Sequence, residues 1–163
     1  GRIEEIGSGA GQGYTVNVPL YGGQGDADYL YVFRELLLPL ARAYAPELIL
    51  VSAGFDTHRN DPLAGMAMSA SAYGQLTGIL RELADECCPG RLALTLEGGY
   101  DHTALSEGAA SVLSTLIQGS DGGNGEGEEP EGADLSESAG TDGETRQIIQ
   151  EVRRVLSPYW RGI

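Results

Sequence analysis

The sequence has 163 residues and a mass of 17.1 kDa, which is enough for one domain or for part of a larger one. All ten basic residues are arginines, so the sequence lacks the lysine that a phosphate-binding loop or a Schiff base requires. The 24 acidic residues give a net charge of −14, which disfavours nucleic-acid binding, and no apolar run is long enough to span a membrane.

The two cysteines, Cys87 and Cys88, are adjacent and too few for a disulfide framework. They favour a reducing compartment, and we expect a cytoplasmic location. The sequence begins with Gly1, and its first residues already resemble the interior of a domain. We therefore expect the chain to be a fragment of a longer protein.

The first half of the sequence predicts two strands with a helix between them. Residues 14–20 contain several β-branched residues and predict a strand. Asp26 is a suitable N-cap for a helix whose apolar stripe continues to residue 41, and Pro39 should kink or shorten this helix. The continuous apolar run at residues 48–54 predicts a central strand that is buried on both faces.

The next segments continue the alternation of strands and helices. Ser69 or Ser71 starts a second predicted helix, residues 91–96 predict a strand, and residues 103–117 predict a third helix. This order is typical of an α/β fold with a parallel sheet and helices on both faces. We assign residues 1–119 to this unit.

The remaining residues differ in composition from this unit. Residues 120–145 carry nine acidic residues, seven glycines and no basic residue, which predicts a disordered acidic linker, or alternatively a lure for a partner. In residues 146–163, apolar side chains at helical spacing predict a short helix that Pro158 ends. We expect this helix to dock on the main unit.

Polar side chains follow the strand at residues 48–54, at the sheet edge where function sits in parallel sheets. A carboxylate such as Asp56 at this edge needs a cation, a metal or several N–H donors. Asp56 and His58 could supply oxygen and nitrogen ligands to zinc, or they could be a turn-capping aspartate and an exposed histidine. Asp101 and His102, which follow the strand at residues 91–96, could complete a four-residue metal site with them.

The segment LEGGYD, residues 96–101, ends the second strand. Gly98 and Gly99 permit a backbone turn that few other residues tolerate. Such a turn can present Tyr100 at the mouth of the sheet, where its phenol can donate a hydrogen bond to a developing oxyanion. Alternatively, Tyr100 packs on the helix that follows.

Four segments carry a family resemblance: GQGYTVNVPL, GDADYL, PELILVSAGFDTHRNDPLAGM and GRLALTLEGGYD, at residues 11–20, 25–30, 46–66 and 90–101. Together they resemble the zinc-dependent deacetylases, which include histone deacetylases, acetylpolyamine amidohydrolases and acetoin-utilisation proteins. The match is to the class II-like, prokaryotic branch. It implies the C-terminal part of an arginase/deacetylase fold, an α/β fold with an eight-stranded parallel sheet.

The resemblance implies roles for individual residues. Asp56, in SAGFD, would be one of three zinc ligands, and the other two would lie upstream, so His58 would not be a ligand. Tyr100, in EGGYD, would polarise the acetamide carbonyl and stabilise the oxyanion, with Gly98 and Gly99 beside the substrate. Leu63 would line the acyl-lysine tunnel and mildly favours a substrate with a neutral stem.

The resemblance therefore implies a metal-dependent amidohydrolase that uses Zn²⁺ to hydrolyse an N-acetyl, acyl-lysine-like amide or a related small molecule. The family's paired histidines and two of its zinc ligands do not occur in this sequence, so we expect no turnover from this chain alone. Its partners would be the acetylated substrate and the missing N-terminal half of the domain, without nucleic acid or membrane. The alternative is a stand-alone, non-catalytic binding module derived from a deacetylase.

Overall fold

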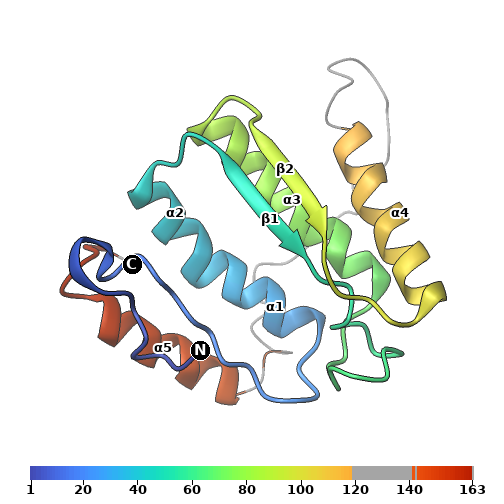
Figure 1. Ribbon diagram of the computed structural model, residues 1–163, viewed down its shortest axis with the longest axis horizontal. Helices are drawn as coiled ribbons and strands as arrows, with labels where there is room; N and C mark the ends of the chain where they lie inside the picture. The colour runs from blue at the N-terminus through green and yellow to red at the C-terminus, as the bar shows by residue number, and fades with distance from the viewer. Residues whose placement is uncertain (119–140, 142, 163) are drawn as a thin grey trace.

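The structure is a computed structural model, and it describes residues 1–118, 141 and 143–162. Two strands, β1 (Ile49–Ala53) and β2 (Leu92–Leu96), pair in parallel (Figure 1). The helical elements are η1 (Gly9–Gly11), α1 (Asp26–Val32), the π-helical turn η2 (Phe33–Leu37), α2 (Leu38–Tyr44), α3 (Ala70–Cys87), α4 (His102–Gln118) and α5 (Gly143–Leu156). The predicted α/β class and parallel sheet are confirmed.

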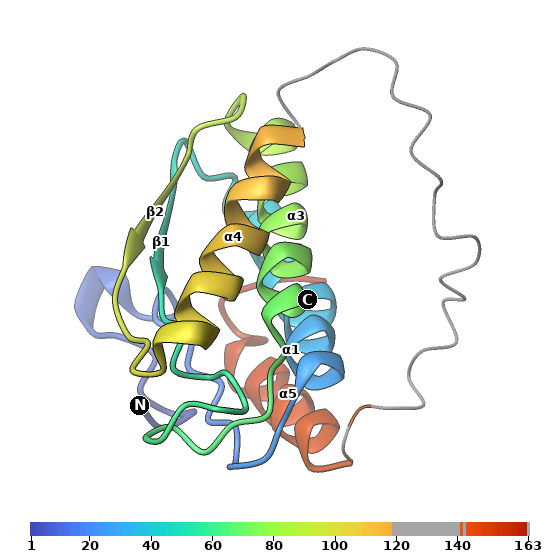
Figure 2. The ribbon, with the colours of Figure 1, turned by 90° about the vertical axis from the view of Figure 1, so that its right-hand side faces the viewer.

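The helices lie on one side of the two-stranded sheet (Figure 2). Along β1, side chains alternate between the two faces: Val51 is half-buried towards the helices, whereas the neighbouring Leu50 is 73% exposed. Leu96 of β2 is exposed as well. The sequence predicts helices on both faces of the sheet. Among the described residues they cover one face, and the other face is exposed.

The core between the sheet and the helices is built by the apolar stripe of α3 and by residues of α4 and the β1 end. Its buried members are Phe55, Met68, Ala72, Tyr73, Leu76 and Val112. Gly108 lets α4 approach this core closely, because a Cβ there would lie only 2.7 Å from Cδ1 of Phe55 and 3.1 Å from Cδ2 of Tyr73. The position of Phe55, directly before Asp56, thus depends on residue 108 of α4 being a glycine.

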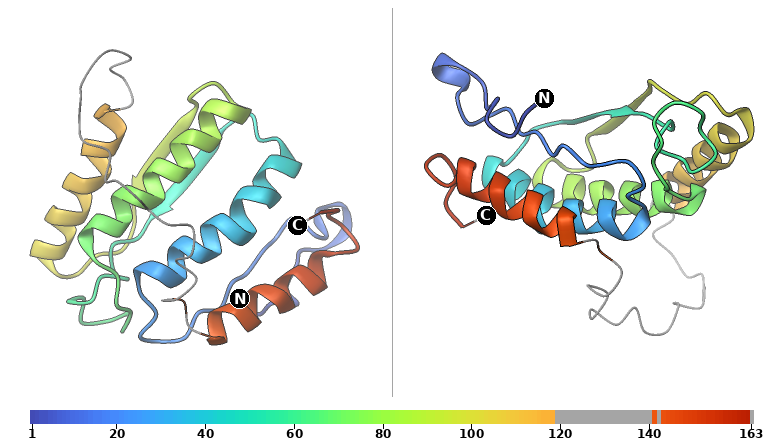
Figure 3. Two further views of the ribbon diagram at one scale, coloured as in Figure 1. Left: turned by 180° about the vertical axis from the view of Figure 1, so that it is seen from behind. Right: turned by 90° about the horizontal axis from the view of Figure 1, so that it is seen from below.

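A second core lies between α5 and the helical segment that begins with α1. The apolar side of α5 buries Ile148, Ile149, Val152 and Leu156 against Val32 and Leu36. The N-terminal segment lies along this pair of helices (Figure 3) and packs Ile3, Ile6, Val16, Val18 and Leu20 against the same cluster. The predicted docking of the C-terminal helix is therefore observed.

The helix α5 begins three residues earlier than predicted, inside the segment assigned to the acidic linker at residues 120–145. Thr145 is fully buried, and its Oγ1 donates a 2.8 Å hydrogen bond to Oδ1 of Asp28 in α1. This contact explains the earlier start, because it places the first turn of α5 against α1. Apart from residue 141 and residues 143–145, the predicted linker lies outside the described residues.

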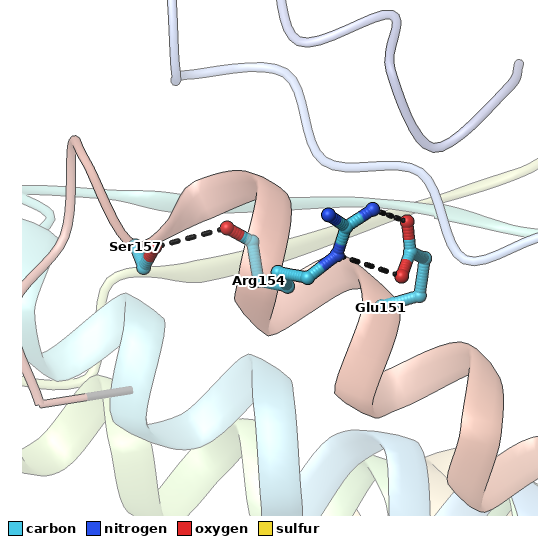
Figure 4. A network of polar contacts seen from close by, with 3 residues as sticks. All are labelled: Glu151, Arg154 and Ser157. Atoms are coloured by element: carbon cyan, nitrogen blue, oxygen red, sulfur yellow. Dashed lines mark hydrogen bonds and ion pairs between the residues drawn. The ribbon is translucent and has the colours of Figure 1, made fainter.

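The outer side of α5 carries a small polar network (Figure 4). Nε of Arg154 donates to Oε2 of Glu151 at 3.0 Å, and the hydroxyl of Ser157 donates to the backbone carbonyl of Arg154 at 2.9 Å. The ion pair is solvent-exposed and contributes little to stability. The hydroxyl supplies a partner to one of the carbonyls that the end of a helix leaves free. None of the helices described is long and apolar enough to cross a bilayer.

Pro39 disturbs the predicted helix as expected, and the structure shows how. The turn before it, Phe33–Leu37, is π-helical, and the helix continues as α2 with the proline near its start. Proline has no N–H to give to the carbonyl of Glu35 four residues earlier. The guanidinium of Arg153 in α5 donates to that carbonyl instead.

Two local predictions are wrong. Residues 14–20 form no strand: the N–H of Thr15 donates to the carbonyl of Ile6, and that of Leu20 to the carbonyl of Val18. Asp26 is not the N-cap of α1, which is Gly25. Instead, Oδ1 of Asp26 accepts the backbone N–H of Ser69 at 2.7 Å, so this carboxylate ties the start of α1 to the start of α3.

Gly108 provides a test of the packing around Phe55. Replacing Gly108 by alanine should destabilise the protein by about 1–3 kcal/mol, because the added methyl overpacks the contact with the two rings. Gly78→Ala in α3 is the matched control: its Cβ would meet nothing closer than 3.8 Å, so the helix should be unchanged or more stable by up to about 1 kcal/mol. Urea denaturation measures both, and equal effects would contradict this packing argument.

Candidate functional site

The two polar segments predicted at the strand ends lie side by side, because the strand pairing continues past β1 and β2. The N–H of Glu97 donates to the carbonyl of Ala53 at 3.0 Å, and the N–H of Phe55 donates to the carbonyl of Gly98 at 2.9 Å. These bonds join residues that follow β1 to residues that follow β2. Asp56 and the Gly98–Tyr100 turn therefore share one edge of the sheet, as the sequence predicts.

The carboxylate of Asp56 lies directly against Gly98. A Cβ on Gly98 would be 2.6 Å from Oδ2 of Asp56 and 2.7 Å from its Cγ, so only glycine leaves room for the carboxylate. Gly99 has a φ of +135°, a conformation that side chains disfavour, and it turns the chain towards Tyr100. The two glycines thus have different roles: Gly98 makes space for Asp56, and Gly99 makes the turn.

Asp56 is half-buried and carries an uncompensated charge in the part of the chain that the structure describes. None of the hydrogen bonds found there reaches its carboxylate, and it lines a cavity of about 300 Å³ with Tyr29 and Tyr73. Burial, together with the nearby Tyr73, Asp56 and Asp28, raises the pKa of Tyr29 to about 12. A half-buried carboxylate without a donor suits a cation as its partner.

Tyr73 of α3 contacts the residues on both sides of Asp56. Its hydroxyl donates to the carbonyl of Phe55 at 3.1 Å and lies 2.9 Å from Oγ1 of Thr57. Burial raises the pKa of Tyr73, so the phenol stays protonated and remains a donor at neutral pH. The segment that carries Asp56 is thereby anchored to the longest helix of the fold.

Asp61 connects the two loops that carry Tyr100 and Leu63. Oδ2 of Asp61 accepts the backbone N–H of Tyr100 at 2.8 Å, and Oδ1 accepts the N–H of Leu63 at 2.9 Å. Asp61 itself is buried, whereas Tyr100 is 58% and Leu63 68% exposed. Burial alone would raise the pKa of Asp61, but hydrogen bonds from four backbone N–H groups lower it: those of Tyr100, Leu63, Ala64 and Asp101.

The structure separates the predicted site residues into two groups. Asp56 and Gly98 are in contact, and Leu63 and Tyr100 are joined through Asp61. The lining of the cavity beside Asp56 does not include Tyr100, whose ring is 58% exposed. The two groups are neighbours: Asp56 and Leu63 belong to the loop after β1, and Gly99 separates Gly98 from Tyr100 in the loop after β2.

The histidines do not form the alternative metal site. His58 is buried rather than exposed, and its Nδ1 accepts the backbone N–H of Asn60 at 3.2 Å. Among the described residues, no three His, Cys, Asp or Glu side chains are close enough to share a metal ion. The predicted four-residue metal site of Asp56, His58, Asp101 and His102 is therefore wrong.

The sequence analysis did not single out Asp61 or the hydroxyl of Tyr73. Asp61 precedes a proline in NDPL, a pattern typical of a turn in which the aspartate bonds backbone N–H groups two residues on, and this signal could have drawn attention to it. Its second bond, to Tyr100, joins distant parts of the sequence and leaves no local signal. Tyr73 lies in the apolar stripe of α3, and this position indicates core packing. It gives no sign of the hydrogen bond that the hydroxyl donates to Phe55.

Comparisons with known proteins agree on one family. A model of the histone deacetylase domain matches residues 1–116. Histone deacetylase 14, chloroplastic, of Arabidopsis thaliana is 43% identical over 117 residues, which cover 72% of this chain and 28% of that protein. Histone deacetylase HDA1 of Saccharomyces cerevisiae is 33% identical over 162 residues, 98% of this chain and 21% of that protein. The solved HDA15 HD domain has a TM-score of 0.81 at 32% identity and covers 98% of this chain and 39% of its own.

The chain belongs to the histone deacetylase domain family. This confirms the predicted resemblance, including its class II-like character, which the similarity to HDA1 and HDA15 supports. The chain spans about a quarter of the length of the curated relatives it matches. The family as a whole is generally zinc-dependent, so the donor set of this chain can be compared with what a zinc ion needs.

The lowered pKa of Asp61 predicts how the loop responds to acid. Because the folded pKa is depressed, the hydrogen bonds to Leu63 and Tyr100 are present at neutral pH and are lost only as the pH falls through a value below about 3.9, the ordinary aspartate pKa. In NMR titrations we expect the amide protons of both residues to shift together with one midpoint below that value. Asp61→Asn should abolish this transition, and separate midpoints for the two amides would contradict it.

Proposed function

We propose that this chain is the C-terminal portion of a zinc-dependent deacetylase that hydrolyses the N-acetyl amide of an acyl-lysine-like substrate. The observation that carries the proposal is the parallel pairing that places Asp56 and the Gly98–Tyr100 turn at one edge of the sheet. Residues 1–119 are part of the catalytic domain in this proposal, and residues 146–163 are its C-terminal helix and tail.

Asp56 fits the role of one zinc ligand. It is a carboxylate at the carboxyl end of a strand, half-buried, and no hydrogen bond described in the structure occupies its oxygens. Carboxylate oxygen is a common zinc ligand, and a catalytic site needs three protein ligands. The other two would come from the part of the domain beyond this chain. When bound, a zinc ion would polarise the amide carbonyl and acidify the attacking water.

Tyr100 fits the role of the oxyanion donor. Its phenol is exposed at the sheet edge, while its backbone N–H is fixed by Asp61. As the amide carbonyl is attacked, negative charge develops on its oxygen, and the phenol O–H donates a hydrogen bond to that oxygen. A donor held in place before the reaction stabilises the transition state more than the ground state.

Leu63 supports an acyl-lysine-like substrate. It is 68% exposed, and its backbone is tied to that of Tyr100 through Asp61. An exposed leucine offers contact to the aliphatic stem of a lysine side chain and no charge to attract a polyamine. Gly98 and Gly99 would lie beside the acetyl group.

We further propose a cytoplasmic location, which the two free cysteines, Cys87 and Cys88, support. Activity requires the remaining portion of the domain, because this chain supplies one candidate zinc ligand and one oxyanion donor. The tests below therefore use the full-length protein that contains this chain.

Tyr100→Phe tests the oxyanion role. Removing the phenol should lower kcat on an acetyl-lysine peptide by about 10²–10³-fold, the usual effect of losing one oxyanion donor, while zinc content stays unchanged. Tyr159→Phe removes a similarly exposed phenol from the segment after α5 and should keep full activity. Unchanged kcat in the Tyr100 variant would reject the assignment.

Asp56→Ala tests the zinc ligand. We expect the variant to lose stoichiometric zinc on dialysis, measured by elemental analysis, because one of three ligands is gone. Gly98→Ala should weaken zinc binding for a different reason, since its Cβ would collide with the Asp56 carboxylate. Full zinc content in both variants would show that the metal, if bound at all, is held elsewhere.

A further inference from the structure

Close to Tyr100 and Leu63, a buried side chain connects the loop after β1 to the loop after β2. The two oxygens of Asp61 divide between the loops: one accepts the N–H of Tyr100 at 2.8 Å, and the other accepts the N–H of Leu63 at 2.9 Å. Asp61 belongs to the loop after β1, whereas Tyr100 belongs to the loop after β2. One carboxylate therefore holds the backbone of Tyr100 at a set spacing from that of Leu63.

Hydrogen bonds fix the chain on both sides of Tyr100, at Gly98 and at Asp101, but these bonds do not involve Tyr100 itself. The carbonyl of Gly98 accepts the N–H of Phe55, and Asp101 begins α4 by accepting the N–H groups of Ala104 and Leu105. Between them, Gly99 adopts a positive φ, so the backbone at Tyr100 has conformational freedom that its neighbours do not remove. Among the described residues, the backbone of Tyr100 is held directly by Asp61.

The ring of Tyr100 makes no packing contact in the described core that would fix its position if the backbone moved. It is 58% exposed in this chain, and no packing contact of the described core includes it. The position of the phenol oxygen therefore follows from the backbone position and from the side-chain rotamer. Catalytic donors lose much of their effect when they are displaced by about 1 Å.

The bonds to Asp61 are stronger than neutral hydrogen bonds. The four backbone N–H groups that face the carboxylate keep it ionised at neutral pH. Hydrogen bonds to a charged acceptor are roughly twice as strong as those between neutral groups. An uncharged residue of the same shape would keep one acceptor oxygen and would turn an amide NH₂ towards a backbone N–H, which repels it.

We propose that Asp61 is a positioning residue that holds the backbone of Tyr100 at a fixed distance from that of Leu63, and so aims the phenol at the oxyanion of a substrate whose stem lies on Leu63. This inference rests on the proposed deacetylase function. It assigns to Asp61 no contact with substrate or metal. Its effect on catalysis passes through Tyr100 alone.

Asp61→Asn in the full-length protein tests the proposal with an acetyl-lysine peptide as substrate. We expect kcat to fall by about 10–100-fold, because the phenol is no longer aimed, while zinc content stays at the wild-type level. In the Tyr100→Phe background the same substitution should change kcat less than twofold, since there is no phenol left to position. Asp85→Asn, at an exposed site of α3, is the matched control and should keep full activity.

The coupling between the two substitutions separates positioning from general support of the fold. If Asp61→Asn lowers kcat by the same factor with and without the phenol, Asp61 does not act through Tyr100 and the proposal is overturned. Wild-type kcat in Asp61→Asn overturns it as well. If Tyr100→Phe itself has wild-type kcat, the proposed function fails first, so the two failures can be told apart.

Asp61→Glu keeps the test decisive should the asparagine variant fold poorly. Glutamate retains the charge and moves both oxygens outward by one methylene, so the fold and the zinc content should be preserved while the Tyr100 loop is displaced. We expect kcat to fall here too, with the same loss of effect in the Tyr100→Phe background. A folded Asp61→Glu variant with wild-type kcat would overturn the proposal.

Discussion

The site depends on the parallel pairing of β1 with β2 and on its continuation past the ends of both strands. The bonds from Glu97 to Ala53 and from Phe55 to Gly98 fix the register of the two loops. This register places Gly98, which has no side chain, against the carboxylate of Asp56. A shift of one residue would turn alternate side chains to the opposite face, and in one direction it would put Glu97 in the place of Gly98.

The open face of the sheet agrees with a chain that supplies part of a domain. Leu50 and Leu96 are largely exposed on strands that are apolar on both faces, and such strands belong in the interior of a parallel sheet. The chain spans about a quarter of its curated relatives, so further strands and helices are available in those proteins to cover this face. The same reasoning applies to Asp56, which in the proposed role of a zinc ligand would need further ligands from outside this chain.

Much of the fold could be predicted from the sequence, because its signals are local. The apolar runs of β1 and β2 and the apolar stripes of α3 and α5 lie where their spacing predicts them. Residues 14–20 have the composition of a strand, yet pairing depends on a partner that composition does not reveal. Asp26 is a good cap by type, but Ser69, distant in the sequence, binds its carboxylate in the structure.

The candidate site could be predicted where a residue's position in the sequence, directly after a predicted strand, indicated a role. Asp56 and Tyr100 each follow a strand within a few residues, and the order of strands implies that their loops meet. Asp61 and the hydroxyl of Tyr73 escaped notice because their contacts join separate elements. A sequence shows which side chains can form hydrogen bonds. Which partner each one binds depends on distances that exist only in the folded protein.

The contact between Arg153 and the carbonyl of Glu35 bears on where this domain ends. The family model stops at residue 116, but the similarity to yeast HDA1 spans 162 residues, and α5 lies in the additional part. A polypeptide that ends after α4 would lack α5. Water would then contact the carbonyl of Glu35, the carboxylate of Asp28 and the apolar side of α1. Expression boundaries chosen from the family match would therefore remove the helix that covers this apolar surface.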